Sequence, residues 1–311
     1  MKNQHALKFR LKKHWSTLLL LLPAVVLGVV FSYVPMVGIL MAFKTNLNLY
    51  IYEPFTAFLN AEWTLENFQI IFAGEEFLGV LWNTLYISVL KIVVLFPLPI
   101  IVSLLLTEVK NIRVSRMYQS LMYLPHFLSW SIITGIFMSV FATDGLVNNV
   151  LILFGMDASE AVNWYTDPSK FVFLVLFTDG WKGIGWSSIV YIAAINAISP
   201  EYYEASRLDG AGKLSQIWYI TLPLIKNVIV TMLIMRICYI MDAGFDQIYT
   251  MHNAATRPVW QIIGTYIYEK GLQQGNYSFS TAVGLFNSVV ALIMILVGNF
   301  VAKKISGKGV I

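Results

Sequence analysis

Six long apolar stretches constrain what this chain can fold into more than any other feature of its sequence. A helix needs about 20 mostly apolar residues to cross roughly 30 Å of hydrocarbon. Stretches of that kind lie at residues 16–43, 80–106, 117–141, 171–198, 224–241 and 281–302. Only 12% of the 311 residues are charged, against about 25% in ordinary soluble domains. The sequence therefore predicts an all-α membrane protein with six transmembrane helices in a single domain over residues 1–311.

Lys and Arg gather in the segments that six spans would place on one side of the lipid bilayer. Most of the 21 Lys and Arg residues lie in the amino-terminal tail, in residues 108–116, in residues 199–226 and after residue 302. The loops on the other side hold only Lys44, Lys170, Arg257 and Lys270. Because an excess of Lys and Arg marks the cytoplasmic side, we expect a multi-pass protein with both termini in the cytoplasm.

One polar segment in the carboxyl-terminal half, residues 201–225, is longer than a turn between two helices requires. Helix connections in bundles usually take about 2 to 8 residues. Ser199 and Pro200 form a helix-start signal, and Gly210 and Gly212 then interrupt the helix. The sequence predicts a helix, a glycine turn and a second helix across the cytoplasmic face. An amphipathic hairpin resting on lipid is the alternative explanation.

The same segment carries a spaced set of residues. Glu204, Ala205 and Ser206 are followed by Gly210 after three residues and by Ile220-x-Leu222-Pro223 after nine more. This pattern resembles the EAA motif of binding-protein-dependent ABC importers, which runs Glu-Ala-Ala, three residues, Gly, nine residues, Ile-x-Leu-Pro. Only Ser206 departs from the pattern, and it is also small. The string EASRLDGAG is similar to the carbohydrate branch of the family, the maltose-type permeases.

The resemblance implies a type I ABC importer permease fold, in which residues 199–226 form a coupling helix between helices four and five. It implies partners: a second homologous permease, two copies of a nucleotide-binding ATPase subunit, and an extracytoplasmic solute-binding protein. It places the protein in a bacterial or archaeal cell membrane. Glu204 would face basic groups of the ATPase, Gly210 would permit the turn, and Asp209 would orient the second half. The expected coupling residues are Glu204, Ala205, Ser206, Asp209, Gly210, Ala211, Leu222 and Pro223.

Residues 210–213, Gly-Ala-Gly-Lys, look like part of a phosphate-binding loop. The complete pattern requires a glycine five residues before the last one and Ser or Thr after the lysine, whereas Arg207 and Leu214 occupy these positions. We find no catalytic grouping and no metal-ligand pattern in the sequence. The sequence therefore predicts no enzymatic activity, no metal and no cofactor in this chain, with ATP and Mg²⁺ on the partner ATPase, and no nucleic-acid partner.

Four charged residues lie inside the predicted spans: Lys91, Asp179, Lys182 and Arg236. A charge in a transmembrane helix usually faces a partner or a water-filled path. Asp179 and Lys182 share one helix face and could neutralise each other. Lys91 could snorkel to the interface or pair with the second permease, and Arg236 could snorkel as well. The other interpretation is a cavity suited to an anionic oligosaccharide.

Residues 177–187 interleave aromatic side chains, polar groups and glycines, as sugar-binding sites do. The glycines are equally typical of close helix packing. The resemblance to the maltose-type permeases implies that two more helices line the substrate path: the helix after Leu124-Pro125 and the helix after the EAA segment. For His126, a packed position in the core is the alternative. The predicted substrate path comprises His126, Trp130, Asp179, Trp181, Lys182, Gly183, Trp186, Arg236 and Asp242.

The segment at residues 242–280 is rich in aromatic residues. An aromatic belt at the outer interface accounts for most of them, and a docking surface for the solute-binding protein is the alternative that the resemblance implies. A permease for another solute class remains a rival for the whole chain. An ion-driven secondary transporter is a further rival, but it predicts inverted repeats and broken helices in two halves, and the sequence has no such symmetry.

Overall fold

The computed structural model describes residues 15–45 and 54–306, and every regular element in these ranges is helical. Within them, extended backbone pairs only at one isolated bridge, between Lys44 and Trp63. The all-α fold expected from the sequence is therefore confirmed. The chain divides into two compact units, Met1–Ile71 with Glu269–Leu285, and Phe72–Tyr268 with Phe286–Ile311.

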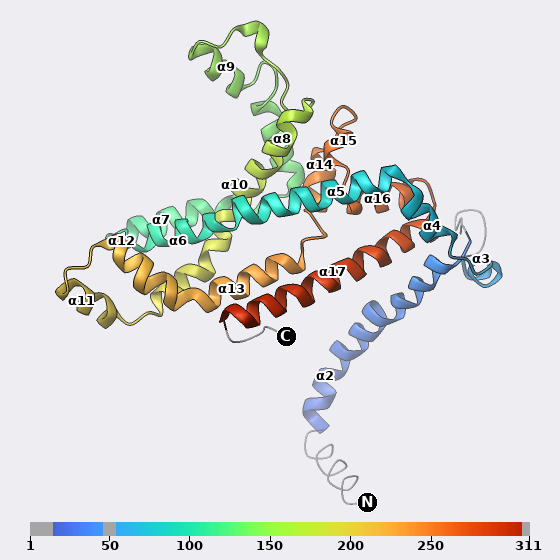
Figure 1. Ribbon diagram of the computed structural model, residues 1–311, viewed down its shortest axis with the longest axis horizontal. Helices are drawn as coiled ribbons and strands as arrows, with labels where there is room; N and C mark the ends of the chain where they lie inside the picture. Colours follow the sequence, from blue (N-terminus) through green and yellow to red (C-terminus); the bar gives the residue numbers. More distant parts are fainter. Residues whose placement is uncertain (1–14, 46–53, 307–311) are drawn as a thin grey trace, which may run out of the picture. The chain divides into compact units, whose positions relative to one another are not determined.

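In the first unit, the described residues start with a long apolar helix. Helix α2 (Trp15–Gly28), the π-helical turn η1 (Val29–Tyr33) and the 3-10 segment η2 (Val34–Phe43) follow one another directly (Figure 1). The change of helical geometry coincides with Pro35, which has no N–H for an α-helical hydrogen bond. Residues Leu18–Phe43 are long and apolar enough to cross a membrane.

Side chains that follow this first helix bind its carboxyl end. The chain continues through α3 (Pro54–Asn60) and α4 (Glu66–Ala73). Nδ2 of Asn67 donates to the carbonyl oxygens of Ala42 at 3.0 Å and Lys44 at 2.8 Å. The last carbonyls of a helix have no partner within the helix, so Asn67 supplies the donors that they lack.

The second unit is built around its longest helix, α10 (Pro168–Asn196). This helix packs along α6 and also contacts α7, α13, α14 and α15 (Figure 1). It is thus the element from which the other helices of the unit are positioned. The other helical elements that lie wholly within this unit are α5 (Glu75–Leu90), η3 (Lys91–Leu95), α6 (Pro97–Thr107), α7 (Ile112–Tyr123), η4 (Leu124–Phe127), α8 (Trp130–Val140), α9 (Leu146–Leu153), η5 (Ala158–Glu160), α11 (Pro200–Leu208), α12 (Lys213–Gln216), η6 (Ile217–Thr221), α13 (Leu222–Cys238), α14 (Phe245–Met251), α15 (Arg257–Trp260) and α16 (Ile263–Tyr268). The element η7 (Glu269–Gln273) belongs to the first unit. Helix α17 (Tyr277–Ser306) belongs in part to each unit.

Asp167 determines where α10 begins. Its carboxylate accepts hydrogen bonds from the backbone N–H of Ser169 at 2.9 Å and from Nζ of Lys170 at 2.7 Å. Pro168 suits the first helical position because its missing N–H is not needed there. The hydrogen bonds from Lys170 and Ser169 lower the pKa of Asp167 from 3.8 to about 2.

The third predicted span, residues 117–141, is not one continuous helix. Helix α7 with η4 meets α8 at an angle of 101°. Pro125 in η4 has no N–H to continue the α-helical ladder. Ser129 is extended, with φ −68° and ψ 154°, and its side chain accepts a hydrogen bond from the N–H of Ile132 as the cap of α8. Residues 117–141 therefore form a bent pair of helices.

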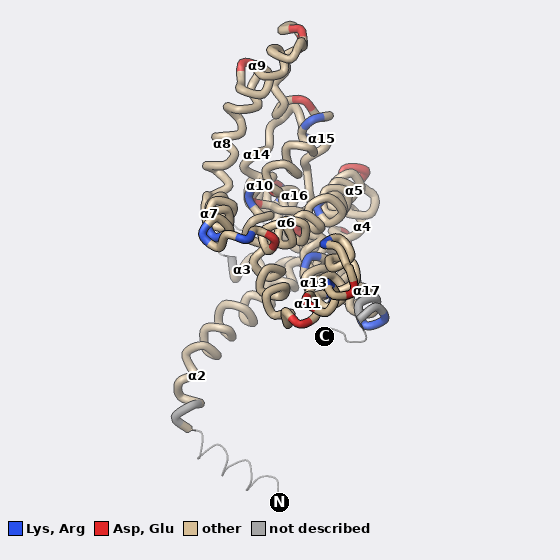
Figure 2. The backbone as a smooth tube through the Cα atoms, turned by 90° about the vertical axis from the view of Figure 1, so that its left-hand side faces the viewer, with Lys and Arg blue, Asp and Glu red and all other residues tan. Residues whose placement is uncertain are grey.

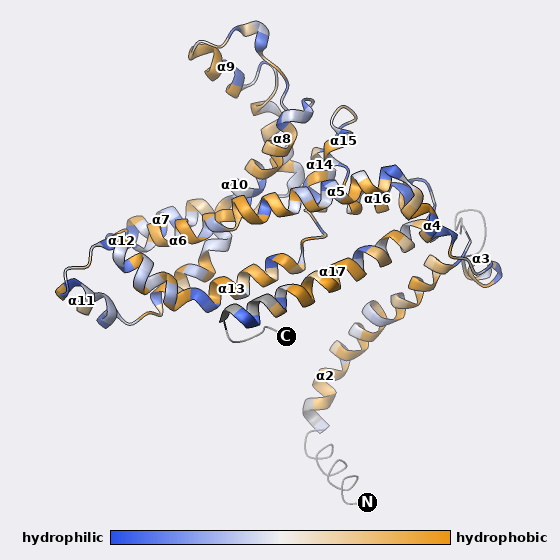
Figure 3. Cartoon of the chain, viewed as in Figure 1, coloured by the Kyte–Doolittle hydropathy of each residue, from blue (hydrophilic) through white to orange (hydrophobic). Residues whose placement is uncertain are grey.

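Within residues 15–45 and 54–306, four helical segments are long and apolar enough to cross a membrane, and the number rises to six if each of two bent pairs counts as one span. The four segments are Leu18–Phe43, Glu75–Thr107, Lys213–Cys238 and Tyr277–Phe300. The bent pairs are α7 and η4 with α8, and α10 with α11, which meet at 68°. Figure 3 shows the hydrophobic residues along α5, α6 and α13. The count of six spans stays a prediction.

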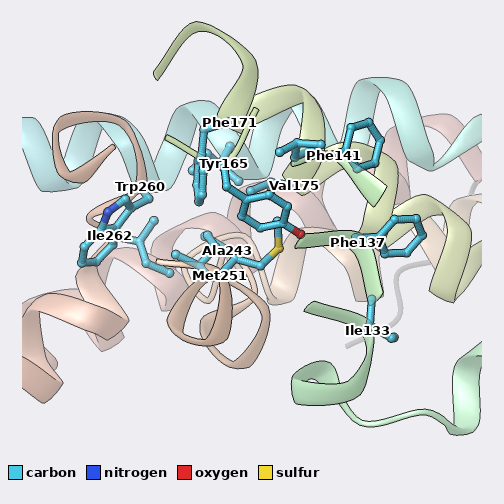
Figure 4. Packing of buried hydrophobic residues seen from close by; sticks show 13 residues of the cluster. Ile133, Phe137, Phe141, Tyr165, Phe171, Val175, Ala243, Met251, Trp260 and Ile262 are labelled. Carbon is cyan, nitrogen blue, oxygen red and sulfur yellow. The ribbon is translucent and has the colours of Figure 1, made fainter. Parts of the chain in front are cut away.

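The apolar core of the second unit joins α8, α10 and the segment from α14 to α15 (Figure 4). Tyr165, Phe171 and Met251 are each no more than 2% exposed within it. Trp260, 6% exposed, also belongs to this core. Tyr266 is 4% exposed. Trp260 and Tyr266 are therefore packed inside the protein and do not contribute to an aromatic belt.

Charged residues of the second unit concentrate near the ends of its helices (Figure 2). Acidic residues, among them Asp144 and Asp157, mark the loops around α9. Basic residues, among them Arg113 and Arg116, mark the first turns of α7. The hydrogen bonds that Asp157 accepts from the backbone and side chain of Ser159 lower its pKa. The charged residues inside the helices are therefore exceptions that require partners.

Candidate functional site

Three charged side chains from three helical elements meet inside the second unit. Nζ of Lys91, at the start of η3, lies 3.2 Å from Oδ2 of Asp179 on α10. Nη2 of Arg236 on α13 lies 3.4 Å from the same oxygen. The carboxylate of Asp179 thus bridges two cations that are far apart in the sequence.

Lys91 is buried and its hydrogen-bonding capacity is filled. Its side chain is 6% exposed, and an ammonium group has three N–H donors. Besides contacting Asp179, Nζ donates to Oε1 of Gln247 at 2.6 Å and to the carbonyl oxygen of Ala243 at 3.0 Å. An unpaired buried charge would be costly, so these three acceptors explain how a lysine is accommodated here. The interpretation that Lys91 snorkels or pairs with a second permease is wrong.

The turn after α13 brings the acceptors to Lys91. Ala243 and Gly244 have φ angles of 51° and 88°, in the left-handed region that favours glycine. A Cβ atom on Gly244 would lie 2.6 Å from Nζ of Lys91, so the close approach also requires glycine. The buried Gln247 fixes α14 against α10, because its Nε2 donates to the carbonyl oxygen of Val175 at 2.7 Å.

Lys182 does not pair with Asp179. Its ammonium donates to the carbonyl oxygen of His126 at 2.9 Å and to that of Leu128, and it lies 5.3 Å from the ring centroid of Trp130. Both carbonyls are at the bend between η4 and α8, where the helical ladder is interrupted. Lys182 therefore supplies hydrogen-bond donors to the bend, and the local pairing that the sequence suggested is wrong.

A cavity of about 230 Å³ opens beside Asp179. Its walls come from η3, α6, α10 and α13, and they combine aromatic and aliphatic side chains with a few polar groups. Such a mixture suits a sugar, since aromatic faces can cover C–H surfaces while polar groups bind hydroxyls. Lining residues include Phe96, Asp179, Gly183, Ser187, Tyr191, Arg236 and Tyr239.

A second cavity, of about 140 Å³, is lined by the same charged residues and by a larger share of polar groups. Asp179, Arg236 and Tyr239 line both cavities. The two cavities therefore share a wall made of an ion pair. The second cavity is also lined by Ser88, Lys91, Trp130, Asp242 and Gln247.

The predicted substrate path is only partly assembled in these cavities. Trp130, Asp179, Gly183, Arg236 and Asp242 line at least one of them, whereas His126, Trp181, Lys182 and Trp186 line neither. The ring of Trp181 packs edge-on against Phe137 with centroids 5.2 Å apart, and His126 stacks on Trp186 at 4.5 Å. Successive residues of a helix point about 100° apart, so Trp181 faces away from Asp179. A role in transport for these residues stays a prediction.

The predicted helix and glycine turn are present at residues 199–226, but a separate second helix across the cytoplasmic face is wrong: α12, η6 and α13 run on as one helix, Lys213–Cys238, so the helix predicted to begin at residue 224 begins at Lys213. Helix α11 ends at Leu208, and α12 begins at Lys213. Between them Gly210 has a φ of 82°, and a Cβ atom there would meet nothing within 4 Å. The N–H of Ala211 donates to the carbonyl oxygen of Ser206 at 2.9 Å and closes the turn. Glycine is therefore needed for its positive φ and not for close packing.

Ser206 has a structural reason to replace the alanine of the motif. Gln216 is 3% exposed, and its Nε2 donates to Oγ of Ser206 at 2.8 Å and to the carbonyl oxygen of Tyr203 at 3.3 Å. The hydroxyl groups of Tyr203 and Thr221 lie 2.9 Å apart. These contacts tie α11 to the start of the helix that follows.

The outward face of α11 is open. Tyr202 is 56% and Leu208 is 90% exposed, and Glu204, Ala205 and Asp209 are exposed as well. Leu222 and Pro223 begin α13. Lys213, beside this segment, forms an ion pair of 2.5 Å with Glu108, and both residues line a cavity of about 490 Å³ together with Glu204 and Arg207.

The described residues hold no group of three or more His, Cys, Asp or Glu side chains that could bind a metal ion. Cys238, at the end of α13, is a free thiol and is half-buried. The groups at the charged cluster can bind a polar ligand through a guanidinium group, hydroxyls and aromatic faces.

A family of known proteins matches most of the second unit. Residues 96–307 fit the family described as "Binding-protein-dependent transport system inner membrane component". The chain belongs to this family. The polygalacturonan/rhamnogalacturonan transport system permease protein YteP of Bacillus subtilis (strain 168) is 40% identical over 294 residues, which cover 94% of this chain and 89% of the relative. Protein LplB of the same strain is 38% identical over 301 residues, covering 96% and 92%.

Solved structures agree with this membership. A chain of a bacterial alginate ABC transporter, in complex with a periplasmic protein that holds an alginate pentasaccharide, superposes with a TM-score of 0.87 and 35% identity. The match covers 97% of this chain and 98% of the other. The family expected from the EAA motif and the type I ABC permease fold are thereby confirmed.

This inner membrane component is a multi-pass permease subunit of a binding-protein-dependent transporter. That membership decides against an ion-driven secondary transporter. The family match includes Asp179, Arg236 and residues 199–226, but it begins after Lys91. The sequence indicated Lys91 only as a charged residue within a predicted span. No pattern in the sequence indicated that Gln247 is its partner.

Proposed function

We propose that this protein is the membrane-spanning permease of an ATP-driven importer of acidic oligosaccharides. Arg236 carries the proposal. Its side chain is 43% exposed on the shared wall of the two cavities, and its only ion pair in the described residues is the 3.4 Å contact with Asp179. A guanidinium has five N–H donors in a planar fork that matches a carboxylate. Arg236 therefore has N–H donors available to bind a uronate group.

The relatives support an acidic substrate. One is named for transport of polygalacturonan and rhamnogalacturonan, and one solved transporter is described as importing the acidic polysaccharide alginate. These polymers share a carboxylate on a sugar ring. The apolar wall of the larger cavity, including Phe96 and Tyr191, suits the faces of such rings.

The proposed mechanism is alternating access driven from outside this chain. Two copies of an ATPase subunit bind ATP and Mg²⁺, and one of them receives α11 through Glu204 and the exposed apolar residues Tyr202 and Leu208. Closure of the ATPase pair moves α11 and the helices behind it. A second, homologous permease receives the other ATPase subunit. The chain itself catalyses no reaction.

The proposed topology is a single domain of six spans with both termini in the cytoplasm. In this topology α11 faces the cytoplasm and α9 faces the outside. A solute-binding protein docks on the outer segments and delivers the oligosaccharide. The acidic side chains around α9, such as Asp144 and Asp157, favour a docking surface with basic patches.

Uptake by the assembled transporter in proteoliposomes tests this function. We expect ATP-dependent uptake of oligogalacturonate in preference to its methyl-esterified, neutral counterpart. Arg236→Met should remove most of this preference, whereas Arg113→Met, at an exposed position on α7, should retain it. Equal uptake of both sugars by the unaltered transporter would contradict the acidic substrate.

A further inference from the structure

The two cations bound to Asp179 differ in how completely they are satisfied. Lys91 has three acceptors for its three protons and is 6% exposed. Arg236 makes one hydrogen bond among the described residues and is 43% exposed. Lys91 therefore holds Asp179 permanently in place, while Arg236 has donors to spare and access to both cavities.

The contact between Asp179 and Arg236 is weak. Its length, 3.4 Å, exceeds the roughly 2.7–2.9 Å of a strong charge-assisted hydrogen bond. Half-exposed ion pairs are also screened by solvent. A ligand carboxylate that makes two parallel hydrogen bonds to the guanidinium would replace this contact with a better one.

Ser88 points to a ligand in the second cavity. It is 5% exposed and lines that cavity. Its hydroxyl is buried and has no hydrogen-bond partner in the described part of the chain. A buried hydroxyl without a partner is unfavourable, so a ligand oxygen in this cavity would satisfy it.

We propose that Asp179 is an exchangeable counter-ion for Arg236, and that the carboxylate of the transported sugar displaces it. In the empty site Asp179 neutralises one of its two cations. When the sugar binds, Arg236 turns to the sugar carboxylate, Asp179 stays with Lys91, and the Ser88 hydroxyl donates to the bound carboxylate. The inference rests on the proposed function and adds how an acidic sugar is distinguished from a neutral one.

The charge balance favours this exchange. Lys91, Asp179 and Arg236 together carry one excess positive charge, which the sugar carboxylate neutralises. Asp242 also lines the second cavity and its charge acts on Lys91, but it is exposed to solvent, which screens it, and it forms no ion pair within the described residues. A neutral sugar offers no anion to replace Asp179, so it gains nothing from Arg236 that water does not also provide.

A double-mutant cycle measured by uptake tests the exchange. The Asp179→Asn and Arg236→Met variants, alone and combined, are assembled with their partner subunits, and KM is measured for oligogalacturonate and for its methyl ester. Because Asp179 competes with the substrate carboxylate, Asp179→Asn should lower the KM for the acidic sugar, relative to the KM for the ester, by about two- to fivefold. In the Arg236→Met background the same substitution should change the KM of both sugars by the same factor.

Ser88→Ala reports on the second cavity. It removes one donor to the bound carboxylate, so KM for the acidic sugar should rise by about two- to tenfold. KM for the ester should rise less, because an ester carbonyl accepts a weaker hydrogen bond than an ionised carboxylate.

The outcomes separate the exchange from the proposed function. If the unaltered transporter shows no preference for the acidic sugar, both are wrong. If it does prefer the acidic sugar, the exchange alone is overturned when Asp179→Asn raises the KM for the acidic sugar relative to that for the ester, changes both equally, or still lowers this ratio without Arg236. If Asp179→Asn alone does not assemble, the double variant that combines Lys91→Gln with Asp179→Asn takes its place in the same measurement. Failure of both to assemble would make Asp179 indispensable to the fold and would also count against the exchange.

Discussion

The charged cluster around Asp179 and the segment around α11 differ in how far their polar and apolar groups are buried and paired within this chain. Lys91 and Gln247 are buried, and the described residues supply acceptors for Lys91 and for the amide of Gln247. In α11, by contrast, Leu208 is 90% exposed and Tyr202 is 56% exposed. Lys91 and Gln247 are satisfied by contacts within this chain, whereas α11 presents apolar and charged groups outward.

This contrast predicts which property each region controls. Substitutions in the buried cluster leave a charge or polar group without a partner, so they should reduce stability. Substitutions in α11 remove few internal contacts, so they should affect communication with the ATPase and leave the fold intact. The experiments below separate these effects, from the largest expected change to the smallest.

Gly210→Val should nearly abolish ATP-dependent uptake while leaving the protein folded and inserted. The φ of 82° at Gly210 is unfavourable for a β-branched residue, so the turn between α11 and α12 must change. Gly212→Ala is the matched control, because Gly212 has an extended backbone with φ −76° and a Cβ atom there meets nothing within 4 Å. Normal uptake by the Gly210→Val transporter would contradict the coupling role.

Lys91→Met should destabilise the protein by about 1–3 kcal/mol, because Gln247 and the carbonyl of Ala243 lose a buried donor and Asp179 keeps only its contact with Arg236. Unfolding by denaturant in detergent measures this change. The pair Lys91→Met and Asp179→Asn should recover part of the loss, and Lys304→Met, at an exposed position near the end of α17, should cost little. An unchanged stability for Lys91→Met would show that the buried contacts do not hold the cluster.

Ser206→Ala restores the alanine of the EAA motif but should cost about 1 kcal/mol of stability, because the amide of Gln216 loses its 2.8 Å acceptor. The measured quantity is the free energy of unfolding. Ser215→Ala removes an exposed hydroxyl from the next helix and should change nothing. A neutral or stabilising effect of Ser206→Ala would mean that the contact with Gln216 is dispensable.

Asp167→Asn should have the smallest effect and should be visible only in acid. The pKa of Asp167 falls from 3.8 to about 2 on folding, so its carboxylate stabilises the fold above pH 3.8 and this contribution is lost as the pH falls toward 2. The midpoint of thermal unfolding, measured across this range, should fall less steeply in the Asp167→Asn variant. Parallel curves for the two proteins would contradict the assignment.

The features that the sequence predicts well are those that depend on residues close together along the chain. Apolar runs of membrane length indicate the helices, Ser199-Pro200 indicates the start of α11, and Gly210 indicates the turn. The bend at Pro125 and Ser129 had local signals too, but the mostly apolar composition of residues 117–141 favoured a single span. Local patterns thus predict the elements and miss their angles.

The charged cluster could not be predicted because its contacts connect distant parts of the chain. Spacing on one helix favours Asp179 with Lys182, yet the structure pairs Asp179 with Lys91 and Arg236. The choice depends on which helices pack together and on the turn at Gly244. It also depends on the broken helix whose carbonyls bind Lys182.

Labelling of one engineered thiol tests most directly whether the sugar passes Arg236. Tyr239 lines both cavities and is 65% exposed, so Tyr239→Cys in a Cys238→Ser background places a single reactive group at the site. We predict that oligogalacturonate slows maleimide labelling of this thiol in the assembled transporter, and that it no longer does so when Arg236→Met is added. Equal labelling rates with and without oligogalacturonate in the Arg236 protein would contradict the account.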